Sequence, residues 1–188
     1  GVRRVVFTSS TVAVGPGRHD DPPRDETRWN EDRQVPYFVA KVEGERRAWA
    51  YARENNLDMV AVLPSGIIGP GFVRKTPSVD IVENIRKGIF RMGVMRGNFP
   101  LVDVRDVAVA HRLALENAAA SGRYIVVHDD NPSFAEFVEL ERSVDPRVPK
   151  AGPVLPDFML PMMPLYDWFS HVAFGTARTL TQELNASL

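Results

Sequence analysis

Val35-Pro36-Tyr37-Phe38-Val39-Ala40-Lys41 is the stretch from which the fold can be predicted. It opens a segment rich in Ala, Glu and Arg and free of interior proline, which predicts a helix from Tyr37 to about Asn55. Short apolar, β-branched runs at residues 2–8 and 58–63 flank this helix and are typical of buried strands. A strand, a long helix and a second strand form a βαβ unit, so the sequence predicts a parallel sheet in an α/β fold.

Tyr37 and Lys41 are one helical turn apart, so their side chains lie on the same face of the predicted helix. An ammonium group beside a phenol lowers the phenol pKa from about 10 and favours the phenolate. A phenol tuned in this way is a usable general acid or base. The alternative is that Tyr37 packs against the body of the protein while Lys41 is solvated.

Polar and glycine-containing segments follow both predicted strands. Ser9 and Ser10 follow the first strand, and Pro-Ser-Gly-Ile-Ile-Gly-Pro-Gly at 64–71 follows the second. Open α/β sheets bind their ligands at the carboxyl ends of such strands. Ser10 could donate a hydrogen bond to a substrate oxygen, and the glycines would let a ligand approach the backbone. Serines that only satisfy loop backbone, and a plain turn at 64–71, are the alternatives.

The rest of the chain contains further helix and strand signals. Helices are predicted at 78–88, from Asp103 to about Ala120 and from Ser133 to about Arg142, with a third strand at 122–127. Asp103 and Asp106, three residues apart, favour a capped helix start over an acid/base pair. Gly44, inside the first helix, suggests close packing against the sheet.

Composition excludes several classes of protein. The chain has 188 residues, 44% of them hydrophobic, and a net charge of -1, which suits one globular domain with a small lobe. Basic residues are scattered among acidic ones, so no nucleic-acid partner is expected. There is no cysteine and the four histidines are far apart, so no metal site is expected. The longest apolar stretch, 155–174, contains charged residues and prolines, so we expect no membrane association. No signal peptide is visible and cysteine is absent, so we expect a cytoplasmic location.

Five segments, taken in order, resemble the extended short-chain dehydrogenase/reductase superfamily (the NAD-dependent epimerase/dehydratase superfamily). The likeness is strongest to the branch of dihydroflavonol reductases, cinnamoyl-CoA reductases and 3β-hydroxysteroid dehydrogenases. The segments are the strand with its serines at 4–10, Glu-Thr-Arg-Trp at 26–29, the Tyr37–Lys41 pair, the loop at 64–70 and the helix start at 102–108. The resemblance covers residues 1 to about 142 well and the tail loosely.

This resemblance implies the C-terminal part of a Rossmann-type doubly wound parallel sheet with a small, mostly helical substrate lobe. Residues 1–75 would form the second half of the dinucleotide-binding domain, and 76–188 the substrate-binding lobe, with 101–127 returning to the sheet. The implied reaction is hydride transfer between NAD(P)H and a small hydrophobic ketone or alcohol. The implied cofactor is NADP or NAD, with NADP favoured.

The resemblance also implies the site residues. Tyr37 would exchange a proton with the substrate oxygen, Lys41 would hold the nicotinamide ribose, and Ser10 rather than Ser9 would hydrogen-bond the substrate oxygen. The implied cofactor-binding set is Thr8, Tyr37, Lys41, Pro64 and Ile67. A nucleotide-sugar epimerase or dehydratase uses the same three catalytic residues and is the alternative enzyme.

One departure from the family pattern shapes the remaining expectations. Such enzymes begin with a Gly-x-x-Gly-x-x-Gly phosphate-binding loop, which this sequence lacks. We therefore expect an internal fragment that binds NAD(P)H weakly by itself. The strand at 2–8 would have an unpaired edge, which favours a homodimer through that edge. A non-catalytic binding module is the alternative from another functional class.

Overall fold

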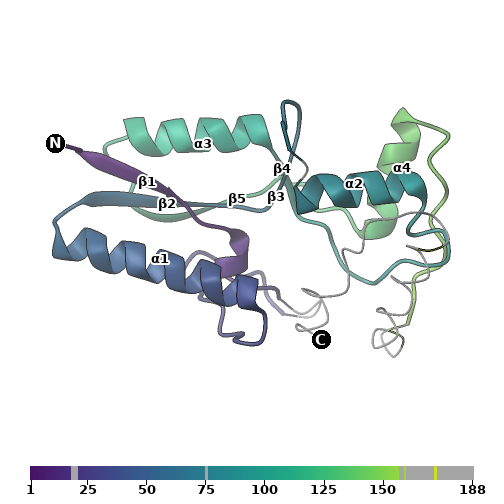
Figure 1. Cartoon of the computed structure of the whole chain (residues 1–188), viewed down its shortest axis with the longest axis horizontal. Helices are drawn as coiled ribbons and strands as arrows, with labels where there is room; N and C mark the ends of the chain where they lie inside the picture. The colour runs from purple at the N-terminus through teal and green to yellow at the C-terminus, as the bar shows by residue number, and fades with distance from the viewer. Residues whose placement is uncertain (18–20, 75, 157–158, 160–171, 173–188) are drawn as a thin grey trace. The chain divides into compact units, whose positions relative to one another are not determined.

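The computed structural model in Figure 1 describes residues 1–17, 21–74, 76–156, 159 and 172. The chain divides into two compact units, residues 1–70 with 101–129 and residues 71–100 with 130–188. Every predicted catalytic or cofactor-binding residue lies in the first unit. The functions assigned to the two parts of the chain stay predictions.

Three parallel strands form the sheet of the first unit, in the order β1-β2-β5. They are β1 (Arg4–Thr8), β2 (Asp58–Pro64) and β5 (Gly122–Val126). The register places Thr8 beside Val62 and Pro64 beside Val126, so the carboxyl ends of the strands meet at one edge of the sheet. The predicted α/β fold with a parallel sheet is confirmed.

The predicted long helix is present as α1 (Pro36–Glu54). Proline is well suited to the first helical position, because the first amides of a helix have no partner within it. The interpretation of Gly44 was wrong. This glycine is exposed, and a Cβ atom built on it would meet no atom within 4 Å. It therefore lies on an outward part of the helix, where it makes no close contact.

Helices cover both faces of the sheet: α1 lies on one face and α3 (Val104–Glu116) on the other (Figure 1). Successive side chains of a strand point to opposite faces. Val62 of β2 accordingly packs in a cluster with Ala114 of α3, whereas Leu63 packs in a second cluster with Trp49 of α1. Burial on both faces explains why β2 is a continuous apolar run rather than an alternating one.

A second, two-stranded parallel sheet was not predicted. β3 (Gly66–Ile68) follows β2 directly and pairs with β4 (Leu101–Asp103), which leads into α3. Strands of three residues are too short to show a periodic pattern in sequence. The glycine loop that was expected after β2 is thus partly held by strand pairing.

The end of α3 also differs from the prediction. The helix stops at Glu116 rather than near Ala120, and Asn117 has extended backbone angles. The guanidinium of Arg4, in β1, donates to three carbonyl oxygens at this end of the helix, those of Ala114, Asn117 and Ala118. A side chain from the first strand therefore caps a helix that is remote in the sequence.

The second unit contains α2 (Pro77–Lys87) and α4 (Phe134–Val144), close to the predicted ranges. Ser133 and Glu136 form a capping box at the start of α4, where the sequence predicted a helix to begin. The Phe134 ring packs against Phe90 and Phe99, with centroid separations of 5.4 and 5.6 Å. His19 and most of the apolar stretch at 155–174 lie outside the described residues.

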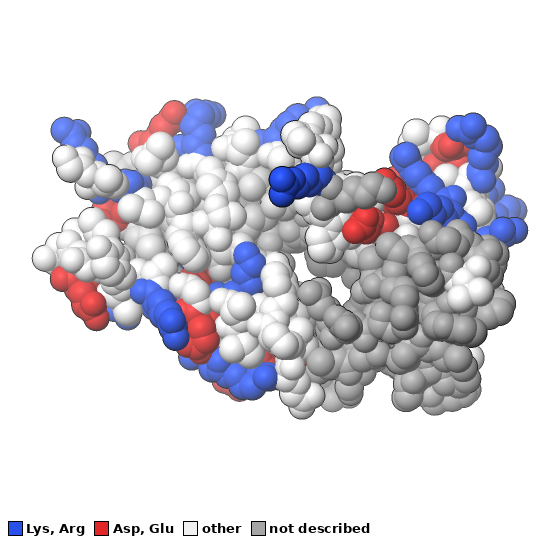
Figure 2. Space-filling model, viewed as in Figure 1, with Lys and Arg blue, Asp and Glu red and all other residues white. Residues whose placement is uncertain are grey.

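The described surface mixes both signs of charge. Figure 2 shows Lys and Arg interspersed with Asp and Glu over the described part of one face. None of the helices that the structure describes is both long and apolar enough to cross a membrane. Within the same residues, no three His, Asp or Glu side chains lie close enough together to hold a metal ion.

Candidate functional site

Two adjacent serines at the carboxyl end of β1 have different environments. Ser9 is buried, and its Oγ donates to Oε2 of Glu45 at 2.5 Å. Ser10 is half-buried, and its Oγ accepts from the amide of Val12 at 3.3 Å, where it caps the short helix η1 (Thr11–Ala13). A hydroxyl that accepts one bond keeps its own hydrogen for a second partner. This geometry favours Ser10 over Ser9 as a donor to a substrate.

Tyr37 and Lys41 lie together on the first turns of α1. Nζ of Lys41 is 5.7 Å from the centroid of the Tyr37 ring. Tyr37 is 41% exposed, so the ring is accessible to solvent, while Lys41 is half-buried. A positive charge held against a phenol favours its ionised form. Because η1 packs against α1, Ser10 caps an element that is in contact with the helix that carries this pair.

Thr8 is hydrogen-bonded to His111, a contact that was not predicted from the sequence. Thr8 Oγ1 lies 2.7 Å from Nε2 of His111 in α3, and His111 Nδ1 lies 2.8 Å from the carbonyl oxygen of Val107. A carbonyl oxygen only accepts, so Nδ1 carries the hydrogen. The hydrogen bond to Nε2 engages the Thr8 hydroxyl within the protein, and a role of Thr8 in cofactor binding stays a prediction.

The junction of β2 and β3 holds the other predicted cofactor residues. Pro64 is buried at the end of β2, and Ile67 is half-buried in β3. Between them, the amide of Ser65 donates to the carbonyl of Val126 at 3.1 Å. The buried Oγ of Ser65 has no hydrogen-bond partner within the part of the chain that the structure describes. Since a buried hydroxyl is costly unless satisfied, these residues fit a polar ligand group such as the carboxamide of the expected nicotinamide.

The turn after β3 is tightly packed against the start of α3. Gly69 has φ +137°, and a Cβ atom there would lie 2.8 Å from Cγ1 of Val104. Asp103, beside it, accepts from the Arg105 amide at 2.7 Å and so caps α3. Hydrogen bonds from Arg105 lower the pKa of the Asp103 carboxyl from 3.8 to about 2. The predicted capping role of Asp103 is confirmed.

The polar loop between η1 and α1 is held to the body of the first unit by two adjacent residues. Buried Asn30 donates Nδ2 to the carbonyl of Val12 at 3.0 Å. The Trp29 ring contacts two guanidinium groups, with its centroid 4.0 Å from Arg123 and 5.0 Å from Arg46. Asn30 and Trp29 therefore anchor the loop that contains the Glu-Thr-Arg-Trp segment.

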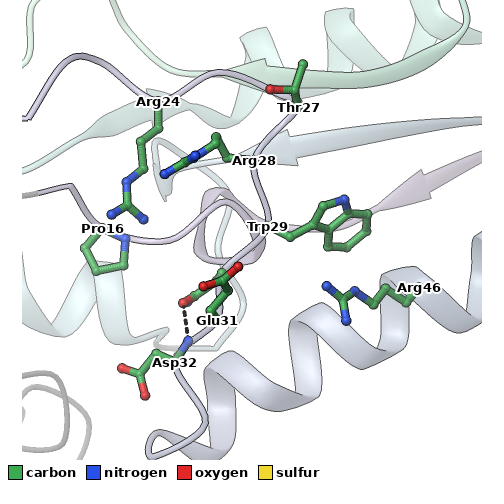
Figure 3. Close-up of a pocket in the computed structure, with 9 residues that line it drawn as sticks. Pro16, Arg24, Thr27, Arg28, Trp29, Glu31, Asp32 and Arg46 are labelled. Atoms are coloured by element: carbon green, nitrogen blue, oxygen red, sulfur yellow. Dashed lines mark hydrogen bonds between the residues drawn. The ribbon is translucent and has the colours of Figure 1, made fainter.

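A cavity of about 510 Å³ lies beside this loop. Figure 3 shows Trp29 extending toward Arg46 of α1, with Arg24 and Arg28 on the loop itself. The lining residues include none of the three predicted catalytic residues. The hollow is therefore a feature of the loop surface and is separate from the Tyr37–Lys41 pair.

Sequence reasoning missed a buried ion pair between α1 and β5. Nε of Arg123 lies 2.7 Å from Oε1 of Glu45, and the two side chains are 8% and 0% exposed. Helical spacing could have predicted the burial of Glu45, because this residue lies three positions after the apolar, buried Val42 and so shares its face of α1. A carboxylate on a buried helix face requires a buried partner.

Comparison with known proteins agrees with this architecture. The model of the family described as "NAD dependent epimerase/dehydratase family" matches residues 1–127. A bifunctional dihydroflavonol 4-reductase/flavanone 4-reductase of Malus domestica is 33% identical over 156 residues, which are 77% of this chain and 44% of that protein. Cinnamoyl-CoA reductase CAD2 of Medicago truncatula is 37% identical over 156 residues, 77% of this chain and 46% of that protein.

A solved structure shows the same fold. Gre2 from Candida albicans, crystallised in complex with NADPH, has a TM-score of 0.67 and 26% sequence identity, covering 84% of this chain and 52% of that one. This chain spans about half the length of the curated relatives it matches. The family match extends over all three strands of the parallel sheet and both helices that cover it. The chain therefore belongs to the NAD-dependent epimerase/dehydratase family.

Proposed function

We propose that this chain carries the catalytic part of an NAD(P)-dependent carbonyl reductase or alcohol dehydrogenase, with Ser10, Tyr37 and Lys41 as its catalytic residues. The observation that carries the proposal is the position of Lys41 Nζ, 5.7 Å from the Tyr37 ring centroid on the first turns of α1. The names of the two plant relatives, both reductases, support reduction over other reactions of the family.

In reduction, the carbonyl oxygen of the substrate becomes an alcohol and needs one proton. The Tyr37 hydroxyl would give that proton to the oxygen and become a phenolate, which the Lys41 ammonium stabilises. The Ser10 hydroxyl would donate a hydrogen bond to the same oxygen and stabilise its developing negative charge. The exposure of Tyr37 would allow it to regain its proton from solvent. In oxidation, the phenolate would take the proton instead.

Bound NAD(P)H would supply the hydride to the carbonyl carbon. Lys41 would hold the nicotinamide ribose, and the backbone at Pro64 and Ile67 would face the ring. The Ser65 hydroxyl, which has no hydrogen-bond partner among the described residues, supports a polar contact at this place. Thr8 completes the proposed set. NADP is proposed over NAD because NADPH is bound in the similar Gre2 structure.

The proposed substrate class is a small hydrophobic ketone or the corresponding alcohol. Dihydroflavonols, flavanones and cinnamoyl-CoA, named for the relatives, share an aromatic group near the reacting carbonyl. A panel for this protein should therefore contain aromatic ketones and acyl-CoA thioesters, together with aliphatic ketones for comparison.

The test uses the protein as its gene encodes it, with NADPH oxidation followed across that panel. Tyr37→Phe is expected to lower kcat by at least about 100-fold, the usual contribution of a general acid. Tyr51→Phe is the matched control, because Tyr51 lies on the same helix and is 62% exposed. The mechanism is wrong if Tyr37→Phe is as active as the parent.

The alternative enzyme is a nucleotide-sugar epimerase or dehydratase, which the description of the family includes. It predicts conversion of a nucleotide sugar without net consumption of NADPH. Absence of turnover on both substrate classes, together with no binding of NADPH, would instead support a non-catalytic binding module.

A further inference from the structure

Glu45 is a fully buried carboxylate on the helix that carries the proposed catalytic pair. It lies one turn after Lys41 and two turns after Tyr37, in a part of α1 that contacts the sheet. Ionised side chains are almost never fully buried unless they are paired. Its complete burial also prevents it from touching a substrate, so it is not a candidate acid or base.

Among the described residues, the bonds to this carboxylate come from Ser9, Trp49 and Arg123, all within the first unit. Arg123 donates to both oxygens, from Nε at 2.7 Å and from Nη2 at 3.3 Å. Trp49 Nε1 donates to Oε1 at 3.1 Å, and Ser9 Oγ donates to Oε2 at 2.5 Å. A bidentate Arg–carboxylate pair has a defined geometry, because the guanidinium group is planar. The carboxylate is thus fixed in direction as well as neutralised.

Arg123 extends the same network into the polar loop. Its Nη1 donates to the carbonyl oxygens of Glu26 and Arg28, each at 2.6 Å. The carboxylate of Glu26 returns to the sheet, where it accepts from the Ile125 amide at 3.0 Å. The ion pair therefore joins four segments: the end of β1, α1, β5 and the loop at 26–29.

The direct link between β1 and α1 matters most for the site. Ser9 precedes Ser10 in the chain, and Glu45 is on the same rigid helix as Tyr37 and Lys41. The bond from Ser9 to Glu45 therefore connects the backbone that carries one proposed catalytic group to the helix that carries the other two.

We propose that Glu45, held by Arg123 and bonded to Ser9, is a positioning residue that sets Ser10 relative to Tyr37 and Lys41. This inference rests on the proposed function. Apolar residues of similar volume often stabilise a protein as well as a buried ion pair does, so stability alone does not explain the pair. The directional hydrogen bonds of the Glu45 carboxylate fix the end of β1 relative to α1. This matters because an error of about 1 Å in the position of a catalytic group costs on the order of 100-fold in rate.

The experiment removes only the link, in the protein as its gene encodes it. Ser9→Ala deletes the bond from β1 to Glu45 and leaves the pair with Arg123 intact. We expect kcat to fall about tenfold while the KM for NADPH stays within about twofold, since Lys41 is not altered. Ser9→Thr keeps the hydroxyl and is expected to stay within about threefold of the parent.

Ser133→Ala is the matched control. It makes the same chemical change but removes the helix cap of α4, in the second unit, and Ser133 takes no part in the network around Glu45 described above. It is expected to lower thermal stability without changing kcat at a temperature where the protein is fully folded. A kcat for Ser9→Ala equal to that of Ser133→Ala would overturn the inference.

A loss in Ser9→Thr as large as that in Ser9→Ala would also overturn it. The proposed function has a separate test, because its failure appears as full activity in Tyr37→Phe. An inactive Tyr37→Phe together with a fully active Ser9→Ala would reject the positioning role alone.

Discussion

Arg4 provides a quantitative test of how the first strand holds α3. Arg4→Met keeps most of the apolar stem of the side chain and removes the guanidinium. The guanidinium donates to the carbonyl oxygens of Ala114 and Asn117 from Nη1, at 2.9 and 2.5 Å, and to that of Ala118 from Nη2, at 3.2 Å. Its Nε also donates to Asp58 at 2.7 Å.

The expected loss of stability follows from these contacts. Three hydrogen bonds worth about 1 kcal/mol each give about 3 kcal/mol. The pair with Asp58 adds at most about 1 kcal/mol, because the Asp58 side chain is 49% exposed and solvent screens it. Water can reach the carbonyl oxygens of the exposed residues Asn117 and Ala118, which reduces the sum. We expect a loss of about 2–4 kcal/mol.

Hydrogen exchange followed by mass spectrometry measures this loss where it arises. A loss of 2–4 kcal/mol corresponds to exchange that is faster by about 30- to 1000-fold in peptides from β1 and α3. Arg3→Met is the control, because Arg3 is exposed, and its effect should stay within about 0.5 kcal/mol. The reasoning is refuted if Arg4→Met and Arg3→Met exchange at the same rate as the parent.

Three further predictions test the fold, its pH dependence and its assembly. Gly44→Ala should raise the free energy of unfolding by up to about 1 kcal/mol, since the site is open and Ala favours a helix. Gly69→Ala should lower it, because of the positive φ and the nearby Val104 side chain. Equal melting temperatures for the two variants would contradict at least one of these assignments. The pKa of Asp103 is about 2 in the folded protein against an ordinary 3.8, so its stabilising effect is present above about pH 4 and is lost as the pH falls toward 2. Asp103→Asn should therefore reduce the pH dependence of stability in that window, as measured by urea unfolding at each pH. Among the described strands, β1 is paired on one side only, so the isolated chain should associate through this edge; light scattering from a monodisperse monomer would reject that proposal.

The order and type of the main elements could be predicted from the amino-acid sequence alone. Apolar runs with β-branched residues indicated the three parallel strands, and composition together with Pro36 and Asn55 delimited α1 to within a residue at each end. Capping patterns at Asp103 and Ser133 placed the starts of α3 and α4. These signals are local, since they depend on residues within one or two turns, and local preferences can be read without knowing which segments meet. The Tyr37–Lys41 pair was predictable for the same reason.

Only the tertiary structure decided how the distant segments are connected. The cap of Arg4 on α3, the pairing of β3 with β4, and the bonds of Glu45 to Ser9 and Arg123 all join residues far apart in the chain. A charged residue in a sequence has many conceivable partners, and packing selects one of them. Packing likewise selects the hydrogen-bond partner of a serine hydroxyl. Ser9 and Ser10 are chemically identical, and only the folded structure distinguishes Ser9, which is bonded to Glu45, from Ser10, which caps η1 and which we propose as a donor to the substrate.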